Sequence, residues 1–233
     1  RARDLQRHHA PDGLMHSDGS DKPWFDRLAH DLRGPLTSLQ TAAYLLRTDP
    51  GGDNAKELAD IVVRQSQRMA RMIEELDDWG RAQQKRLVDR SERVDVEAAL
   101  DMAIASQHGL VIASDIADDA RGLHVQGDVA RMTQMFRTLL LHAASRDAAN
   151  ARVCVARDGA QVQVVFCDDG PALDATARER LLQAPLVPPP DDGLGLRLLI
   201  AKAIALGHGG TLDVEAPADG ASLRLRCALP LAE

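Results

Sequence analysis

Two stretches near the start of the chain carry apolar residues at helical spacing. In the first, which begins at about Lys22, the members recur three or four residues apart as in a coiled-coil seam: Phe25, Leu28, Leu32, Pro35, Leu39, Ala42 and Leu46. Asp49-Pro50-Gly51-Gly52 interrupts it. The second seam has one polar member: Leu58, Val62, Gln65, Met69, Met72, Leu76 and Trp79. Together they predict an antiparallel helical hairpin, which buries both seams only by forming a homodimeric four-helix bundle.

After about Ser91 helical and strand patterns alternate. Helices are expected over 95–107, 128–148, 173–182 and 196–206, and strand and turn over 110–126. Two further strand pairs are expected, 153–156 with 161–167 through a turn at Asp158-Gly159, and 211–215 with 222–229. Helices on one face of a mixed sheet make an α+β sandwich. We therefore divide the chain into a linker or disordered N-terminus (1–21), a helical hairpin (22–90) and an α+β domain (91–233).

Composition narrows the class of protein. The net charge of −7 argues against nucleic-acid binding, which calls for a basic surface. The three cysteines have no C-x-x-C spacing, which fits free thiols in a reducing, cytoplasmic compartment better than disulfides or a zinc site. No apolar run approaches the roughly 18 residues that span a bilayer, so no membrane contact is expected within this chain. The chain begins with Arg1, which is compatible with a fragment of a membrane-anchored protein.

The first helix carries the strongest candidate for chemistry, His30. It follows the seam residue Leu28 by two positions, a rotation of about 200° that turns it away from the seam. Asp31 beside it can hold one ring nitrogen protonated and leave the other free to attack. Pro35 can bend the helix below it. Alone, His30 would be read as an ordinary surface histidine; the acid, the proline, the seam and the downstream domain together favour a functional one.

Residues 30–37, His-Asp-Leu-Arg-Gly-Pro-Leu-Thr, resemble the H-box of the sensor histidine kinases. The resemblance implies that His30 accepts the γ-phosphoryl group of ATP and that Asp31 assists as the adjacent base. The family usually has Thr or Asn before the proline, where the side chain positions water for phosphatase activity. Gly34 stands there, so phosphatase activity by that route is not expected.

The second half resembles the Bergerat-type ATPase domain of the same family, and the likeness covers about residues 22 to 231 in all. Gly127-Asp128 and the helix after it resemble the N-box, and the segment from Asp168 through Gly170 to Leu173 resembles the G1 box, in which Asp168 would receive the adenine amino group. Gly193-Leu194-Gly195 resembles the G2 box, whose backbone N–H groups would meet phosphate.

Several residues depart from the family's pattern. His142 stands where the family has an Asn that coordinates Mg²⁺, and the expected Lys falls at Ser145, with Arg146 beside it. Mg²⁺ prefers oxygen ligands, so weakened Mg-ATP binding is expected, and no metal ligand is assigned. A protonated His142, or Arg146, would contact phosphate directly. Ala172 replaces a G1 glycine, and the loop over 185–192 is short and rich in proline.

Two functions from different classes fit these observations. The first is an enzyme, a dimeric protein histidine kinase that phosphorylates His30 from ATP and passes the phosphoryl group to an Asp of a response-regulator receiver domain. The alternative is an ATP-independent histidine phosphotransferase or pseudokinase that docks a receiver domain on the same scaffold. His30 and Asp31 suit both; Asp168, Gly193 and Gly195 favour the first, and His142 and the Pro-rich loop favour the second.

Overall fold

A computed structural model describes residues 22–107, 111–218 and 220–232, so the expected linker at 1–21 lies outside the described residues. The described residues fall into two compact units, divided between Ser66 and Gln67 within the second long helix. Each unit is described below by itself.

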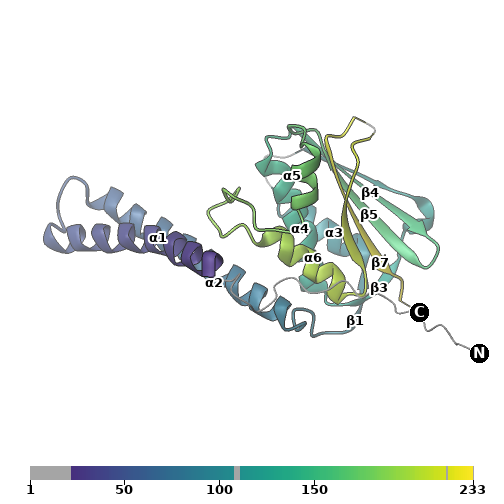
Figure 1. Ribbon diagram of the computed structural model, residues 1–233, viewed down its shortest axis with the longest axis horizontal. Helices are drawn as coiled ribbons and strands as arrows, with labels where there is room; N and C mark the ends of the chain where they lie inside the picture. The colour runs from purple at the N-terminus through teal and green to yellow at the C-terminus, as the bar shows by residue number, and fades with distance from the viewer. Residues whose placement is uncertain (1–21, 108–110, 219, 233) are drawn as a thin grey trace, which may run out of the picture. The chain divides into compact units, whose positions relative to one another are not determined.

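The first unit contains α1 (Lys22–Thr48) and the beginning of α2 (Ala55–Gln83), joined by a turn at the predicted Asp-Pro-Gly-Gly segment (Figure 1). The turn is closed by the N–H of Gly52 on the carbonyl of Asp49, 3.3 Å apart. Seam residue Ala42 is 2% exposed. Other large apolar side chains of this unit stay exposed: Leu36, Tyr44, Leu45 and Val63.

The second unit is built on a five-stranded mixed sheet of order β2-β4-β5-β7-β6, in which only β2 and β4 run parallel. Its strands are β2 (Val111–Ile116), β4 (Asn150–Asp158), β5 (Gln161–Asp168), β6 (Thr211–Glu215) and β7 (Leu223–Pro230). β4 and β5 form the hairpin expected at Asp158-Gly159, where Gly159 has φ 58°. A separate antiparallel pair joins β1 (Glu92–Asp95), which the sequence pattern did not predict, to β3 (His124–Gly127).

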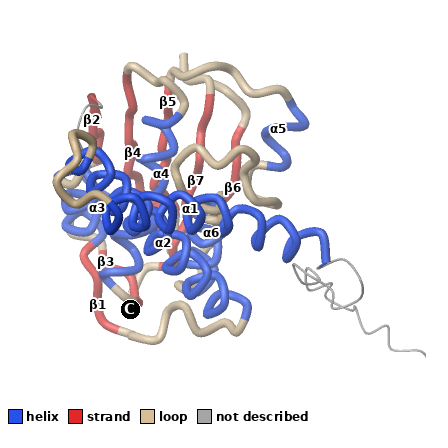
Figure 2. Tube along the Cα trace, turned by 90° about the vertical axis from the view of Figure 1, so that its left-hand side faces the viewer, coloured by secondary structure: helices blue, strands red, loops and turns tan. Residues whose placement is uncertain are grey.

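Helices cover one face of this sheet, as Figure 2 shows. α3 (Val96–Ala105), α4 (Val129–Ser145) and α6 (Arg197–Gly207) pack side by side, with α4 in the middle and against β5. The apolar stripe of α4 supplies much of the core, and Phe136 meets Phe166 of β5 with ring centroids 5.6 Å apart. Asp128 caps α4 by accepting the N–H of Arg131. A short helix α5 (Ala175–Arg180) and a 3₁₀ turn η1 (Asp118–Ala120) complete the unit. The predicted fold class, a helical hairpin followed by an α+β ATPase-like domain, is confirmed.

His208 ties the end of α6 to the start of α4. Its Nε2 accepts the backbone N–H of Asp128 at 3.1 Å, and its Nδ1 lies 2.8 Å from the carbonyl oxygen of Ile204. These two bonds require one neutral tautomer, with the proton on Nδ1. A side chain at Gly127 would collide with the imidazole, so glycine is needed there. His208 is therefore a structural histidine.

The second half of α2 belongs to the second unit. Met72 is fully buried there, and Trp79 is 7% exposed. Beside the apolar seam, Asp78 accepts Nη1 of Arg131 at 2.7 Å and the side-chain amide of Gln134 at 2.6 Å. This part of α2 is thus joined to α4 through Asp78.

Candidate functional site

His30 lies on the open face of α1. Its side chain is 83% exposed, and its Nδ1 is 3.4 Å from Oδ1 of Asp31. Oδ2 of Asp31 lies 3.4 Å from Nε of Arg27. If Nδ1 carries the proton toward Asp31, Nε2 points its lone pair to solvent. The geometry therefore suits a nucleophilic imidazole that is accessible to a large phosphoryl donor.

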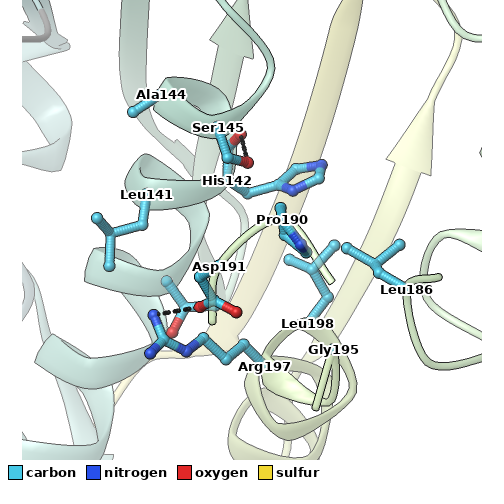
Figure 3. A pocket seen from close by; sticks show the side chains of 11 residues that line it. Leu141, His142, Ala144, Ser145, Leu186, Pro190, Asp191, Gly195, Arg197 and Leu198 are labelled. Atoms are coloured by element: carbon cyan, nitrogen blue, oxygen red, sulfur yellow. Dashed lines mark hydrogen bonds and ion pairs between the residues drawn. The ribbon is translucent and has the colours of Figure 1, made fainter. Parts of the chain in front are cut away.

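A cavity of about 320 Å³ opens between α4, the Pro-rich loop and the start of α6 (Figure 3). Eleven residues line it: Thr138, Leu141, His142, Ala144, Ser145, Leu186, Pro190, Asp191, Gly195, Arg197 and Leu198. They come from the segments that carry the predicted N-box and G2 box.

His142 is the cavity residue with the least usual environment. The residue is 9% exposed, and neither ring nitrogen has a hydrogen-bond partner among the described residues. Burial, helped by the charge of Arg146, lowers the pKa of His142 to about 4. The imidazole is therefore neutral near pH 7, so the protonated form that would attract phosphate is not the one present. Figure 3 shows its ring projecting from α4 toward Pro190.

Arg146 and Asp168 are brought together, away from the cavity lining. Nε of Arg146 lies 3.2 Å from Oδ1 and 3.3 Å from Oδ2 of Asp168, and the two side chains are 9% and 4% exposed. Arg146 also donates to the carbonyl of Pro171, and the N–H of Gly170 donates to Asp168 at 3.0 Å. The carboxylate expected to read adenine is thus occupied by an arginine. The expected contact of Arg146 with phosphate stays a prediction.

The predicted boxes have glycine at positions where neighbouring backbone leaves no room for a side chain. A side chain at Gly170 would meet the carbonyl oxygen of Arg146 at 2.7 Å. Gly195 has φ 77° and packs on the backbone of Leu186, whose N–H donates to its carbonyl. Both glycines therefore have structural reasons to be present, in addition to any contact with a ligand.

The backbone N–H groups of the predicted G2 box are taken by a residue that sequence reasoning missed. Oε2 of Glu75, on α2, accepts the N–H of Leu194 at 3.1 Å and that of Leu196 at 3.2 Å. Its Oε1 lies 3.3 Å from Nε of Arg197. In the sequence Glu75 is one of several acids beside the seam of α2, so no local signal set it apart. Glu75 is more than a hundred residues from this loop in the sequence, and only the folded structure shows that the two are in contact.

The described residues contain no group of three or more His, Cys, Asp or Glu side chains that could hold a metal ion. Nor does any helix over those same residues combine the length and apolarity needed to cross a membrane.

Two protein-family profiles match the chain. Residues 24–85 match the His Kinase A (phospho-acceptor) domain. Residues 127–233 match the family described as histidine kinase-, DNA gyrase B-, and HSP90-like ATPase. The first match contains His30 and Asp31, and the second contains the cavity.

Curated relatives are similar along most of the chain. The sensory histidine kinase/phosphatase NtrB of Rhodobacter capsulatus is 28% identical over 228 residues, covering 89% of this chain and 61% of the relative. The signal transduction histidine-protein kinase/phosphatase MprB of Mycobacterium ulcerans is 29% identical over 203 residues, covering 80% and 39%. The chain thus spans less than two thirds of the length of these relatives.

Solved structures share the fold. The histidine kinase AdeS of Acinetobacter baumannii superposes with a TM-score of 0.67 at 19% identity, covering 88% of this chain and 98% of that one. The histidine kinase ThkA, solved in complex with the response regulator protein TrrA, gives a TM-score of 0.68 at 15% identity, covering 91% of this chain and 62% of that one.

Proposed function

The chain belongs to the sensor histidine kinases of two-component systems, and from that premise we propose that it phosphorylates its own His30 from ATP and passes the phosphoryl group to an aspartate of a receiver domain. The observation that carries the proposal is His30 itself. It is an exposed imidazole with a carboxylate on one ring nitrogen, in the phosphoacceptor domain of a chain that also has an ATPase-type domain.

The chemistry proposed for His30 needs little covalent assistance. The Nε2 lone pair attacks the γ-phosphorus, the bond from that phosphorus to the β–γ bridging oxygen breaks, and ADP leaves. The Nδ1 proton, held at Asp31, passes to that carboxylate or to water as the ring becomes phosphoimidazole. Arg27 lies 3.4 Å from the other oxygen of this carboxylate and helps to orient it.

The nucleotide would bind in the second unit. We propose that its phosphates enter the cavity near His142 and Gly195 and use the N–H groups of the loop from Gly193 to Leu196. Its base would lie toward Asp168 and Gly170, which requires Arg146 to yield the carboxylate. ATP use is supported by the match of this unit to the ATPase family.

Mg²⁺ does not fit the side chain that stands at its expected position. Mg²⁺ takes oxygen ligands in an octahedral shell, and His142 offers a single neutral nitrogen. The unpartnered ring nitrogens of His142 are better suited to a hydrogen bond with the ligand itself.

The proposed partners are a second copy of the chain and a receiver domain. The exposed apolar side chains on the hairpin, among them Tyr44, Leu45 and Val63, support self-association. The relative ThkA was solved with the response regulator TrrA, which supports docking of a receiver domain. The described cysteines, Cys154, Cys167 and Cys227, are free thiols, which suits the reducing cytoplasm.

The source of the phosphoryl group separates this function from the ATP-independent alternative. The purified chain is given γ-labelled ATP in one reaction and a labelled phospho-receiver domain in another. A kinase gains acid-labile label from ATP. Label gained only from the receiver domain contradicts the kinase and establishes the phosphotransferase.

A further inference from the structure

Glu75 is a buried carboxylate that the phosphoryl-transfer chemistry does not use. It is 5% exposed, and both of its oxygens are engaged by the loop between Gly193 and Arg197. Burial raises the pKa of Glu75, and the negative charge of Asp191 raises it further. The N–H groups of Leu194 and Leu196 and the positive charge of Arg197 lower the pKa, but the net shift is upward. The carboxylate is therefore held in this place at a cost in desolvation.

The place that Glu75 occupies is chemically an anion site. Leu196 precedes α6, an eleven-residue helix with no acidic residue in its first turn and no side-chain cap of its own. Orphan N–H groups at a helix start attract negative charge, and Glu75 supplies it from another element. A side chain at Gly193 would collide with Oε1, so this glycine is what lets the carboxylate approach.

Glu75 is part of a charged stripe along α2, which we define as Arg68, Arg71, Glu75 and Asp78. Members three or four residues apart lie on one helix face, next to the apolar seam. Arg68 donates to the carbonyl of Asp192 at 3.3 Å, and Arg71 lies 3.6 Å from its carboxylate. Asp78 binds Arg131 of α4. The charged stripe thus contacts the Pro-rich loop, the G2 box and α4.

We propose that Glu75 is an intramolecular competitor of the nucleotide phosphates, and that the described arrangement is a self-inhibited state in which α2 closes the G2 box. This inference rests on the proposed ATP-dependent function. Two anions cannot share the N–H groups of Leu194 and Leu196, because each N–H offers one proton and the oxygens repel each other. Nucleotide binding then requires Glu75 to leave, and by linkage bound nucleotide loosens α2 from this loop by the same factor.

Removing the competitor should therefore strengthen nucleotide binding. If the closed state holds about nine-tenths of the molecules, Glu75→Ala lowers the apparent Kd for ATP about tenfold, since affinity scales with the open fraction. Glu75→Gln keeps the shape and one acceptor but loses the charge, so it should fall between wild type and Glu75→Ala. Glu74→Gln is the matched control, because Glu74 is the neighbouring exposed acid on α2 and removes the same charge.

Two measurements on the whole chain test the inference, ATP titration by calorimetry and amide hydrogen exchange at Leu194 and Leu196 without nucleotide. We expect exchange at these amides to quicken by at least about tenfold in Glu75→Ala and to stay slow in Glu74→Gln. If the wild type binds ATP and Glu75→Ala binds no tighter, the inference is overturned while the proposed function stands. If neither chain binds ATP at millimolar concentration, both are overturned.

Discussion

Arg146 and Asp168 form a buried ion pair, with Nε 3.2 Å from Oδ1, where a base-reading carboxylate was expected to stand open. Breaking such a pair leaves an uncompensated charge in the interior, which costs about 3–5 kcal/mol. We predict that Arg146→Met lowers the free energy of unfolding by that amount in urea titrations. The double variant Arg146→Met/Asp168→Leu should recover most of the loss, because it removes both charges. Additive losses in the double variant would mean that the two side chains do not interact.

The neutral state of His142 predicts a pH dependence of stability. Its pKa is about 4 in the folded chain and near 6.5 when unfolded. Between these values the unfolded chain binds the proton and the folded chain does not, so stability falls as the pH drops from about 6.5 to about 4. The contribution of this residue is about 3 kcal/mol. The difference in unfolding free energy between wild type and His142→Asn should therefore change by this amount over that window. A difference that is flat with pH would show that His142 is not buried as described.

His142→Asn also restores an oxygen ligand at the cavity. We predict that this variant binds ATP more tightly in the presence of Mg²⁺ than in EDTA, whereas the wild type binds with little dependence on the ion. Calorimetric titrations with and without Mg²⁺ measure both. Strong Mg²⁺ dependence in the wild type, unchanged by the substitution, would contradict the role given to this position.

Self-association is best tested with residues that the chain itself leaves exposed. Leu45 is 44% and Val63 54% exposed, whereas Met72 on the apolar seam is fully buried within one chain. Leu45→Glu/Val63→Glu should give monomers by light scattering without loss of helicity, while the exposed polar control Gln40→Glu stays dimeric. A wild-type chain that is already monomeric at micromolar concentration would refute the dimer.

Elements with strong periodicity were predictable from the sequence. The seam from Leu58 to Trp79 predicted α2, and Asp158-Gly159 between β-branched runs predicted the β4–β5 hairpin. The strand Glu92–Asp95 was missed because it is a four-residue strand with three charged residues and a single buried side chain, so its pairing with β3 is set by tertiary structure.

The candidate site was predictable only where its residues are close in sequence. His30 and Asp31 are neighbours, so their contact follows from one helix. Arg146 and Asp168 are 22 residues apart, and Glu75 and Leu194 are 119 apart. By resemblance, Asp168 was expected to bind adenine and the N–H of Leu194 to bind phosphate. In the fold, Arg146 and Glu75 occupy these two groups instead. Long-range pairing of charges leaves no periodic trace in a sequence, which is why both contacts were missed.

The central claim is that the phosphoryl group of ATP arrives at His30. The most direct test gives γ-labelled ATP to wild type, His30→Gln and Asp31→Asn, with acid and alkali stability of the label measured. We predict acid-labile, alkali-stable label in the wild type, about a hundredfold slower labelling in Asp31→Asn because the adjacent base is lost, and none in His30→Gln. Label that persists at wild-type level in His30→Gln would contradict the account.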